Sequence, residues 1–247
     1  MPFPGYYFLF YMLLLCVGQA GAAELRVAVA SNFFLPMQEI VSAYEQQSEN
    51  TIKLSIGSSG KHYAQLQNGA PFDMLFSADS NKVYLLEQQK LIIPGTRFTY
   101  AIGRLALVSM EPENEAGAEL GVLTQRAGRI AIANPMLAPY GRAAQQTLQQ
   151  AGLWEQLQPR LVVGENASQT LQFVASRNAR FGFVAASYLS MPELSFAFVW
   201  PVPDSMHEPI VQQAGILRDS PAARDFARFV SGESGRAVIT RYGYHLP

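Results

Sequence analysis

Four short stretches of the chain place hydroxyl or amide side chains, or a tyrosine, after an apolar run and before a helical pattern. They are Ser31-Asn32, Ser58-Ser59-Gly60, Pro139-Tyr140-Gly141 and Asn166-Ala167-Ser168. A helix N-terminus leaves backbone N–H groups unpaired and carries the positive end of the helix dipole, so each turn can hold an anion without a formal positive charge. Hydroxyl groups in the first three stretches add further donors. The pattern predicts a site for an ionised oxyanion, which offers only acceptors.

The apolar runs before these turns indicate strands, and the segments after them have the spacing of amphipathic helices. This alternation predicts an α/β fold with mainly parallel sheets, helices on both faces, and a ligand cleft beyond the carboxyl ends of the strands. Two long apolar segments, 100–110 and 207–217, interrupt the alternation and are interpreted as crossings between two lobes. We therefore predict one lobe from residues 24–99 and 208–247, and a second from residues 100–207.

The N-terminus has the features of an export signal. An uninterrupted apolar run from Tyr6 to Val17 is followed by small residues up to Ala23, which predicts a signal peptide over residues 1–23 and a periplasmic protein. A membrane-anchored tail and a lipoprotein remain as alternatives. The single cysteine, Cys16, lies inside this segment, so the mature chain has no disulfide or thiolate chemistry. A net charge of −1 gives no electrostatic basis for nucleic-acid binding.

Other kinds of site find little support. Gly60-Lys61 lacks the remaining residues of a phosphate-binding loop, and the serines around Gly57 do not form a nucleophile motif. The three histidines, His62, His207 and His245, are scattered, so no metal ion or other cofactor is expected. Asp73 and Asp79 are interpreted as flanking a strand and capping the next helix. A hydrolase of phosphate or sulfate esters stays open as an alternative that lacks an identifiable nucleophile.

Five stretches of the mature chain carry a family resemblance. They are residues 30–40, 57–79, 132–148, 153–174 and the closing 241–244, and the most specific is Gly69-Ala70-Pro71-Phe72-Asp73 through Ser77-Ala78-Asp79. In these stretches the chain resembles the periplasmic molybdate-binding proteins, the substrate-binding components of molybdate ABC importers. The resemblance implies a two-lobed, type II-like periplasmic-binding-protein fold. It also implies a monomer that captures molybdate, and tungstate with it, and delivers the anion to the permease and ATPase subunits.

The resemblance also implies roles for individual residues. Ser31 and Ser59 would donate from hydroxyl and backbone, and Tyr140 and Ala167 from the backbone N–H, with Asn32 and Ser58 as their neighbours. Many members carry a tyrosine donor after the strand that corresponds to Phe181–Val184, where this chain has Ala185. The hydroxyl of Tyr140, which stands where those members have alanine, is a hypothetical replacement. This departure leaves a different oxyanion, such as sulfate or phosphonate, as an alternative ligand.

Overall fold

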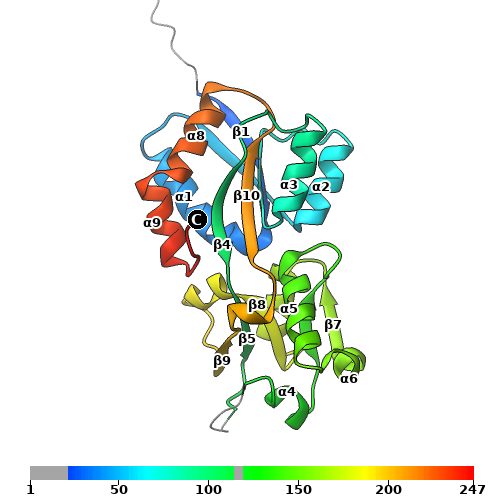
Figure 1. Ribbon diagram of the computed structural model, residues 1–247. Helices are drawn as coiled ribbons and strands as arrows, with labels where there is room; N and C mark the ends of the chain where they lie inside the picture. Colours follow the sequence, from blue (N-terminus) through cyan, green and yellow to red (C-terminus); the bar gives the residue numbers. More distant parts are fainter. Residues whose placement is uncertain (1–21, 114–118) are drawn as a thin grey trace, which may run out of the picture.

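The computed structural model describes residues 22–113 and 119–247 of the chain. These residues form two α/β lobes, drawn one above the other in Figure 1, each built on its own five-stranded sheet. The predicted signal peptide lies outside the described residues, except for Ala22 and Ala23, and so does Cys16. Within the described ranges, no helix has the length and apolar character needed to cross a membrane.

The sheet of the first lobe has the strand order β2-β1-β3-β10-β4. Its strands are β1 (Glu24–Ala30), β2 (Thr51–Gly57), β3 (Met74–Ser77), β4 (Phe98–Gly103) and β10 (Ile210–Ile216). Helices α1 (Phe34–Glu45), α8 (Pro221–Ser231) and α9 (Glu233–Arg241) lie on one side of the sheet, and α2 (Ser59–Gln67) and α3 (Ser80–Gln88) lie on the other (Figure 1).

Apolar packing on both faces explains why β1 and β3 are almost continuously hydrophobic. On one face, an aromatic cluster that includes Phe33, Phe76, Tyr100 and Phe226 joins the sheet to α1, α8 and α9. A smaller cluster on the other face fixes α2 and α3. Strand β1 contributes to both clusters, because successive side chains of a strand point to opposite faces. The turn that follows β1 is therefore held on a rigid, central strand.

The sheet of the second lobe has the order β7-β6-β8-β5-β9. Its strands are β5 (Leu105–Ser109), β6 (Ile130–Ala133), β7 (Leu161–Gly164), β8 (Phe181–Ala185) and β9 (Phe198–Pro201). The helices of this lobe are α4 (Val122–Gln125), α5 (Pro139–Gln150), α6 (Trp154–Leu157) and α7 (Ala167–Ala175). One hydrophobic cluster joins these elements into a single core.

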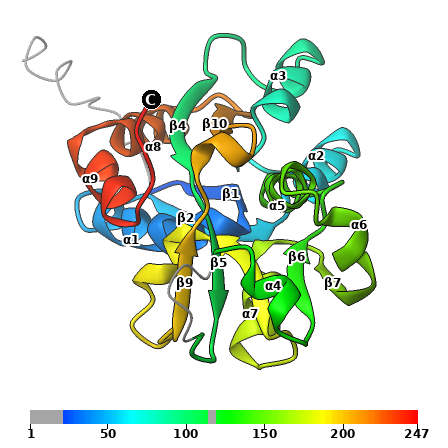
Figure 2. The same cartoon turned by 60° about the horizontal axis from the view of Figure 1, so that its bottom comes forward.

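The crossings between the lobes differ in detail from the sequence-based prediction. The segment 100–110 is not one strand: β4 ends at Gly103, which is paired with Ile210, and β5 begins at Leu105, which is paired with Ala185. Arg104 alone separates the two sheets, so the first lobe extends beyond the predicted boundary at residue 99. The return segment contains the 3-10 turn η4 (Asp204–Met206) before β10 begins. The two crossings run side by side in Figures 1 and 2.

The two-lobed α/β fold is confirmed, but each sheet is more mixed than predicted. In each sheet two strand pairings are parallel and two are antiparallel. Every antiparallel pairing includes β5 or β10, the strands that follow the outgoing and the return crossing. The strands that lead into the four turns, β1, β2, β6 and β7, all belong to the parallel halves.

Candidate functional site

The four turns lie on facing edges of the two lobes. In the first lobe Ala30 is paired with Gly57, so the turns that follow β1 and β2 start side by side. In the second lobe Ala133 is paired with Gly164, which brings the other two turns together in the same way. Direct hydrogen bonds join the two pairs: the Gly60 N–H donates to the Leu137 carbonyl at 2.8 Å. The lobes are therefore closed over the region that the sequence predicts as the oxyanion site.

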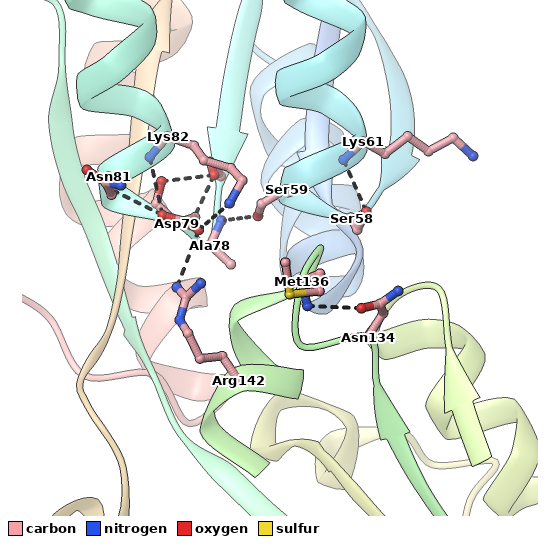
Figure 3. A network of polar contacts seen from close by, with 11 residues as sticks. Ser58, Ser59, Lys61, Ala78, Asp79, Asn81, Lys82, Asn134, Met136 and Arg142 are labelled. Carbon is pink, nitrogen blue, oxygen red and sulfur yellow. Dashed lines mark hydrogen bonds and ion pairs between the residues drawn. The ribbon is translucent and has the colours of Figure 1, made fainter. Parts of the chain in front are cut away.

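The adjacent serines Ser58 and Ser59 have different functions. Ser58 is the N-cap of α2, and its Oγ accepts a hydrogen bond from the Lys61 N–H at 3.2 Å. Ser59 is buried, and its Oγ accepts from the Ala78 N–H at 3.0 Å (Figure 3). Each hydroxyl accepts from one backbone N–H and keeps its proton to donate. Ser59 is in addition the first residue of α2, so its N–H has no intrahelical partner and the residue can offer an anion two donors.

The turn after β1 forms a short 3-10 segment, η1 (Ser31–Phe33), whose carbonyl groups are bound by the other lobe. The Tyr188 hydroxyl donates to the Ser31 carbonyl at 3.0 Å, and the Ser187 hydroxyl donates to the Asn32 carbonyl at 2.9 Å. In a trans peptide the N–H points opposite to the C=O, so these bonds direct the Asn32 N–H away from Tyr188. The Ser31 Oγ makes no hydrogen bond to another described residue and remains available as a donor.

The side chain of Asn32 is turned inward and is already engaged. Its Nδ2 donates to Gln212 Oε1 at 2.9 Å and to the Tyr244 hydroxyl at 3.1 Å, and the residue is 2% exposed. Both protons of the amide are used in these bonds. Asn32 therefore contributes to an anion site through its backbone N–H, while its side chain fixes the turn from behind.

Tyr140 offers an anion its backbone rather than a free hydroxyl. It is the second residue of α5, after Pro139, so its N–H belongs to the first turn, where helix donors have no intrahelical partner. Its hydroxyl points toward the crossings: it accepts from Gln212 Nε2 at 3.4 Å and leaves no room for a Cβ at Gly103. The hypothesis that this hydroxyl replaces a missing tyrosine at the anion thus conflicts with where the hydroxyl lies.

Ala167 is the first residue of α7, and Asn166 caps that helix as the sequence predicts. Asn166 Oδ1 accepts from the Gln169 N–H at 3.1 Å, and Gln169 Oε1 accepts from the Glu165 N–H at 2.6 Å. The neighbouring Ser168 Oγ lies 3.5 Å from the Ser31 carbonyl in the other lobe. The N-terminus of α7 therefore abuts the turn after β1, which brings Ala167 and Ser31 into one site.

Sequence reasoning missed the residues that support this site from behind. They are Ser187, Tyr188, Gln212 and Tyr244. Tyr188 lies in a 3-10 segment, η3 (Ala186–Ser190), that starts just after the position where the family tyrosine is missing. Ala185 itself offers no side-chain donor. Tyr188, three residues later, donates its hydroxyl to the Ser31 carbonyl in the turn after β1. A tyrosine so close to the expected position was the one available signal.

Cationic side chains lie at the edges of the site. Lys61 Nζ pairs with Glu165 across the lobes at 3.0 Å, and both side chains are about half exposed (50% and 43%). Asp79, as predicted, caps α3 through the Asn81 and Lys82 N–H groups. Its buried carboxylate also pairs with Lys82 Nζ at 2.9 Å and with Arg142 of the other lobe at 3.3 Å (Figure 3). Among residues 22–113 and 119–247, no group of three His, Cys, Asp or Glu residues could hold a metal ion.

The Asp79 ion pairs predict a pH dependence of stability. Burial opposes ionisation of this carboxyl, but the bonds to Lys82 and the charge of Arg142 outweigh it and lower its pKa below 3.8. A lowered folded-state pKa contributes stability above the unfolded pKa, and that stability is lost as the pH falls through the folded pKa. We expect the unfolding temperature of the wild type to fall more steeply below about pH 4 than that of Asp79→Asn. Parallel curves would contradict this assignment.

Two α/β lobes that close over four helix-terminal turns are the architecture of a solute-binding protein. The family model for bacterial extracellular solute-binding proteins matches residues 25–245, and the chain belongs to this family. It is 42% identical to the molybdate-binding protein ModA of Azotobacter vinelandii over 241 residues, which cover 95% of this chain and 94% of that protein. The ModA of Rhodobacter capsulatus is 36% identical over 230 residues, which cover 91% and 89% of the two chains.

A solved structure supports the same relationship. The periplasmic molybdate-binding protein of Azotobacter vinelandii superposes with a TM-score of 0.84 at 37% identity, covering 90% of this chain and 99% of that one. These relatives are described as binding proteins, not as enzymes. Neither the similarity nor the fold requires a catalytic group in the cleft.

Proposed function

We propose that this protein captures molybdate, and tungstate with it, in the periplasm and delivers the anion to an ABC importer. The observation that carries the proposal is the convergence of four turns whose donors are hydroxyl and backbone N–H groups. A tetrahedral dianion presents only acceptors, so it is matched by donors on all sides and needs no buried cation. Relatives that are 42% and 36% identical over most of the chain are named for molybdate, which favours this anion over sulfate or phosphonate.

Binding in this proposal is coupled to closure of the lobes. Ser31, Ser59 and the Asn32 N–H come from the first lobe, whereas the N–H groups of Tyr140 and Ala167 come from the second. An anion held by one lobe gains the other donors only when the cleft closes, so it stabilises the closed form. Molybdate and sulfate have the same charge and shape, but molybdate is larger. Donors fixed on two rigid lobes can therefore separate them by size.

The proposal includes the cellular context. A signal peptide over residues 1–23 would export the chain, and the mature protein would act as a monomer without a cofactor. The permease and ATPase subunits of the importer would be its partners, with the permease contacting the closed form. The family description as extracellular supports an exported protein.

Calorimetric titration tests the proposal directly. The protein lacking residues 1–23 is titrated with molybdate, tungstate, sulfate and phosphate in separate experiments. We expect tight one-to-one binding of the first two anions and no heat of binding from sulfate or phosphate. Stronger binding of sulfate or phosphate would assign the protein to a different oxyanion. Absence of heat from all four would contradict an inorganic oxyanion as the ligand.

A further inference from the structure

A buried hydrogen-bonded ring joins the turn after β1 to the second lobe at the crossings. Gln212 Nε2 donates to the Tyr140 hydroxyl at 3.4 Å, and the Tyr140 hydroxyl also neighbours that of Tyr244. Tyr244 donates to the Asn32 carbonyl at 2.7 Å, and Asn32 Nδ2 closes the ring by donating to Gln212 Oε1 at 2.9 Å. All four residues are buried. In the rest of this section these four residues are called the hinge ring.

Only one member of the hinge ring belongs to the second lobe. Asn32, Gln212 and Tyr244 are fixed to the first lobe by η1, β10 and the segment after α9, whereas Tyr140 is carried by α5. Opening of the cleft would move Tyr140 away from the other three residues and break its bond with Gln212. Closure restores it and tightens the Asn32 turn, because hydrogen bonds in a connected network polarise one another.

Gln212 has a special place in the ring because it both accepts and donates. Its oxygen accepts from Asn32 Nδ2 and also from the Tyr100 hydroxyl at 3.0 Å, while its nitrogen donates to Tyr140. In this arrangement the carboxamide supplies both an acceptor and a donor from one side chain. Gln212 is 0% exposed and lies on β10, the strand of the return crossing. It reaches two of the four turns through the side chains of Asn32 and Tyr140.

We propose that Gln212 is the positioning residue that couples closure of the lobes to the donor geometry of the anion site. It does so by linking Tyr140, on the helix that approaches the anion, to Asn32, in the turn that receives it. This inference rests on the proposed function, because it assigns a role in binding of the oxyanion. Gln212 does not itself contact the anion; it orients two residues that do so through their backbones.

The replacement of Gln212 by glutamate separates a positioning role from simple filling of space. The protonated carboxyl of Gln212→Glu has one donor and one acceptor and reproduces the carboxamide. The ionised form can only accept, so its bond with Tyr140 has to reverse, with the Tyr140 hydroxyl donating, and it places a buried negative charge behind the turn that receives the anion. Burial disfavours ionisation and raises the carboxyl pKa toward the neutral range. The titratable groups that contact this position are Tyr100, Tyr140 and Tyr244, and burial raises the pKa of all three above 10.0, so they remain neutral.

The experiment measures molybdate affinity between about pH 5.5 and about pH 8.5 for the wild type, Gln212→Glu and Gln213→Glu. Gln213 follows on the same strand but bonds to Arg97 and Thr99, so its variant adds the same charge outside the ring. We expect Gln212→Glu to bind about tenfold more weakly at high pH, equivalent to about 1.4 kcal/mol. Its affinity should return toward that of the wild type at low pH. Gln213→Glu should follow the wild type throughout.

A double-mutant cycle keeps the test informative if the charged variant folds poorly. Gln212→Met and Tyr140→Phe each cut the bond between the two residues without adding charge. If Gln212 acts through Tyr140, the two single losses of molybdate affinity overlap. The double variant will then lose less affinity than the product of the two single losses. Circular dichroism and the unfolding midpoint establish that each variant is folded.

The outcomes separate this inference from the proposed function. Two results would overturn the role of Gln212 alone, provided that the wild type binds molybdate. One is an affinity of Gln212→Glu that does not change with pH. The other is a double variant whose loss of affinity equals the product of the two single losses. Failure of the wild type to bind molybdate at any pH would overturn the proposed function and this inference with it. A matching pH profile in Gln213→Glu would show that added charge, not position, causes the change.

Discussion

Replacing Gly60 by valine is expected to weaken molybdate binding about 100-fold, and replacing it by alanine about tenfold. A Cβ at Gly60 would lie 2.9 Å from the Leu137 Cα and 3.0 Å from its carbonyl oxygen, both backbone atoms of the other lobe. Because backbone cannot move aside as a flexible side chain does, the lobes would have to separate. Overpacking of this kind costs roughly 1–3 kcal/mol and occasionally more. Calorimetric titration measures the loss of affinity.

The same substitutions should leave the unliganded fold intact. Gly60 lies in the first turn of α2, and the three atoms nearest to the added Cβ all belong to Leu137. Alanine favours a helix over glycine by up to about 1 kcal/mol, so the unliganded unfolding midpoint of Gly60→Ala should not fall. Gly121→Ala is the matched control, since its nearest neighbour is a side-chain atom 3.8 Å away. Unchanged affinity in Gly60→Val would show that binding does not require the close approach of α2 and Leu137.

Ser59→Ala is expected to reduce molybdate affinity about 30-fold. The hydroxyl of Ser59 accepts from the buried Ala78 N–H and has one proton left for the anion. A hydrogen bond to a charged group contributes roughly 1.5–3 kcal/mol, and alanine removes it. Alanine also leaves the Ala78 N–H without its acceptor, so the unfolding midpoint should fall as well. Titration and thermal unfolding of the same sample measure the two effects separately.

Ser58→Ala is the natural comparison, because it removes a hydroxyl one residue away. Ser58 caps α2, and loss of such a cap costs about 1 kcal/mol of stability. We expect this variant to be destabilised but to lose much less affinity than Ser59→Ala. The opposite order of affinities would exchange the functions of the two serines.

The features predicted from the sequence are those with local causes. Helix starts at Ser58, Asp79 and Asn166 follow from capping, which depends on residues two or three positions away. The central strands β1 and β6, which precede two of the four turns, follow from apolar runs buried on both faces. Because parallel strands end at the same edge of a sheet, these local signals were sufficient to predict that the turns gather in pairs.

The features that the sequence did not reveal depend on long-range pairing. The boundary between the lobes falls at Arg104 because Gly103 is paired with Ile210 and Leu105 with Ala185, and no local pattern marks that break. Gln212 and Asn32 are 180 positions apart, and both are ordinary residues for their local elements. The inward direction of the Tyr140 hydroxyl likewise depends on the space above Gly103, which only the assembled crossings define.

The position of β10 also has a consequence for the order in which the chain can fold. This strand lies between β3 and β4, so the inner edges of those two strands have no partner until residues 210–216 are present. The second-lobe strands, residues 105–201, are synthesised before that segment. During this interval two strand edges are open, and open edges are templates for aggregation. The first lobe therefore cannot complete its sheet until the second lobe has been made, although its residues are the first to arrive.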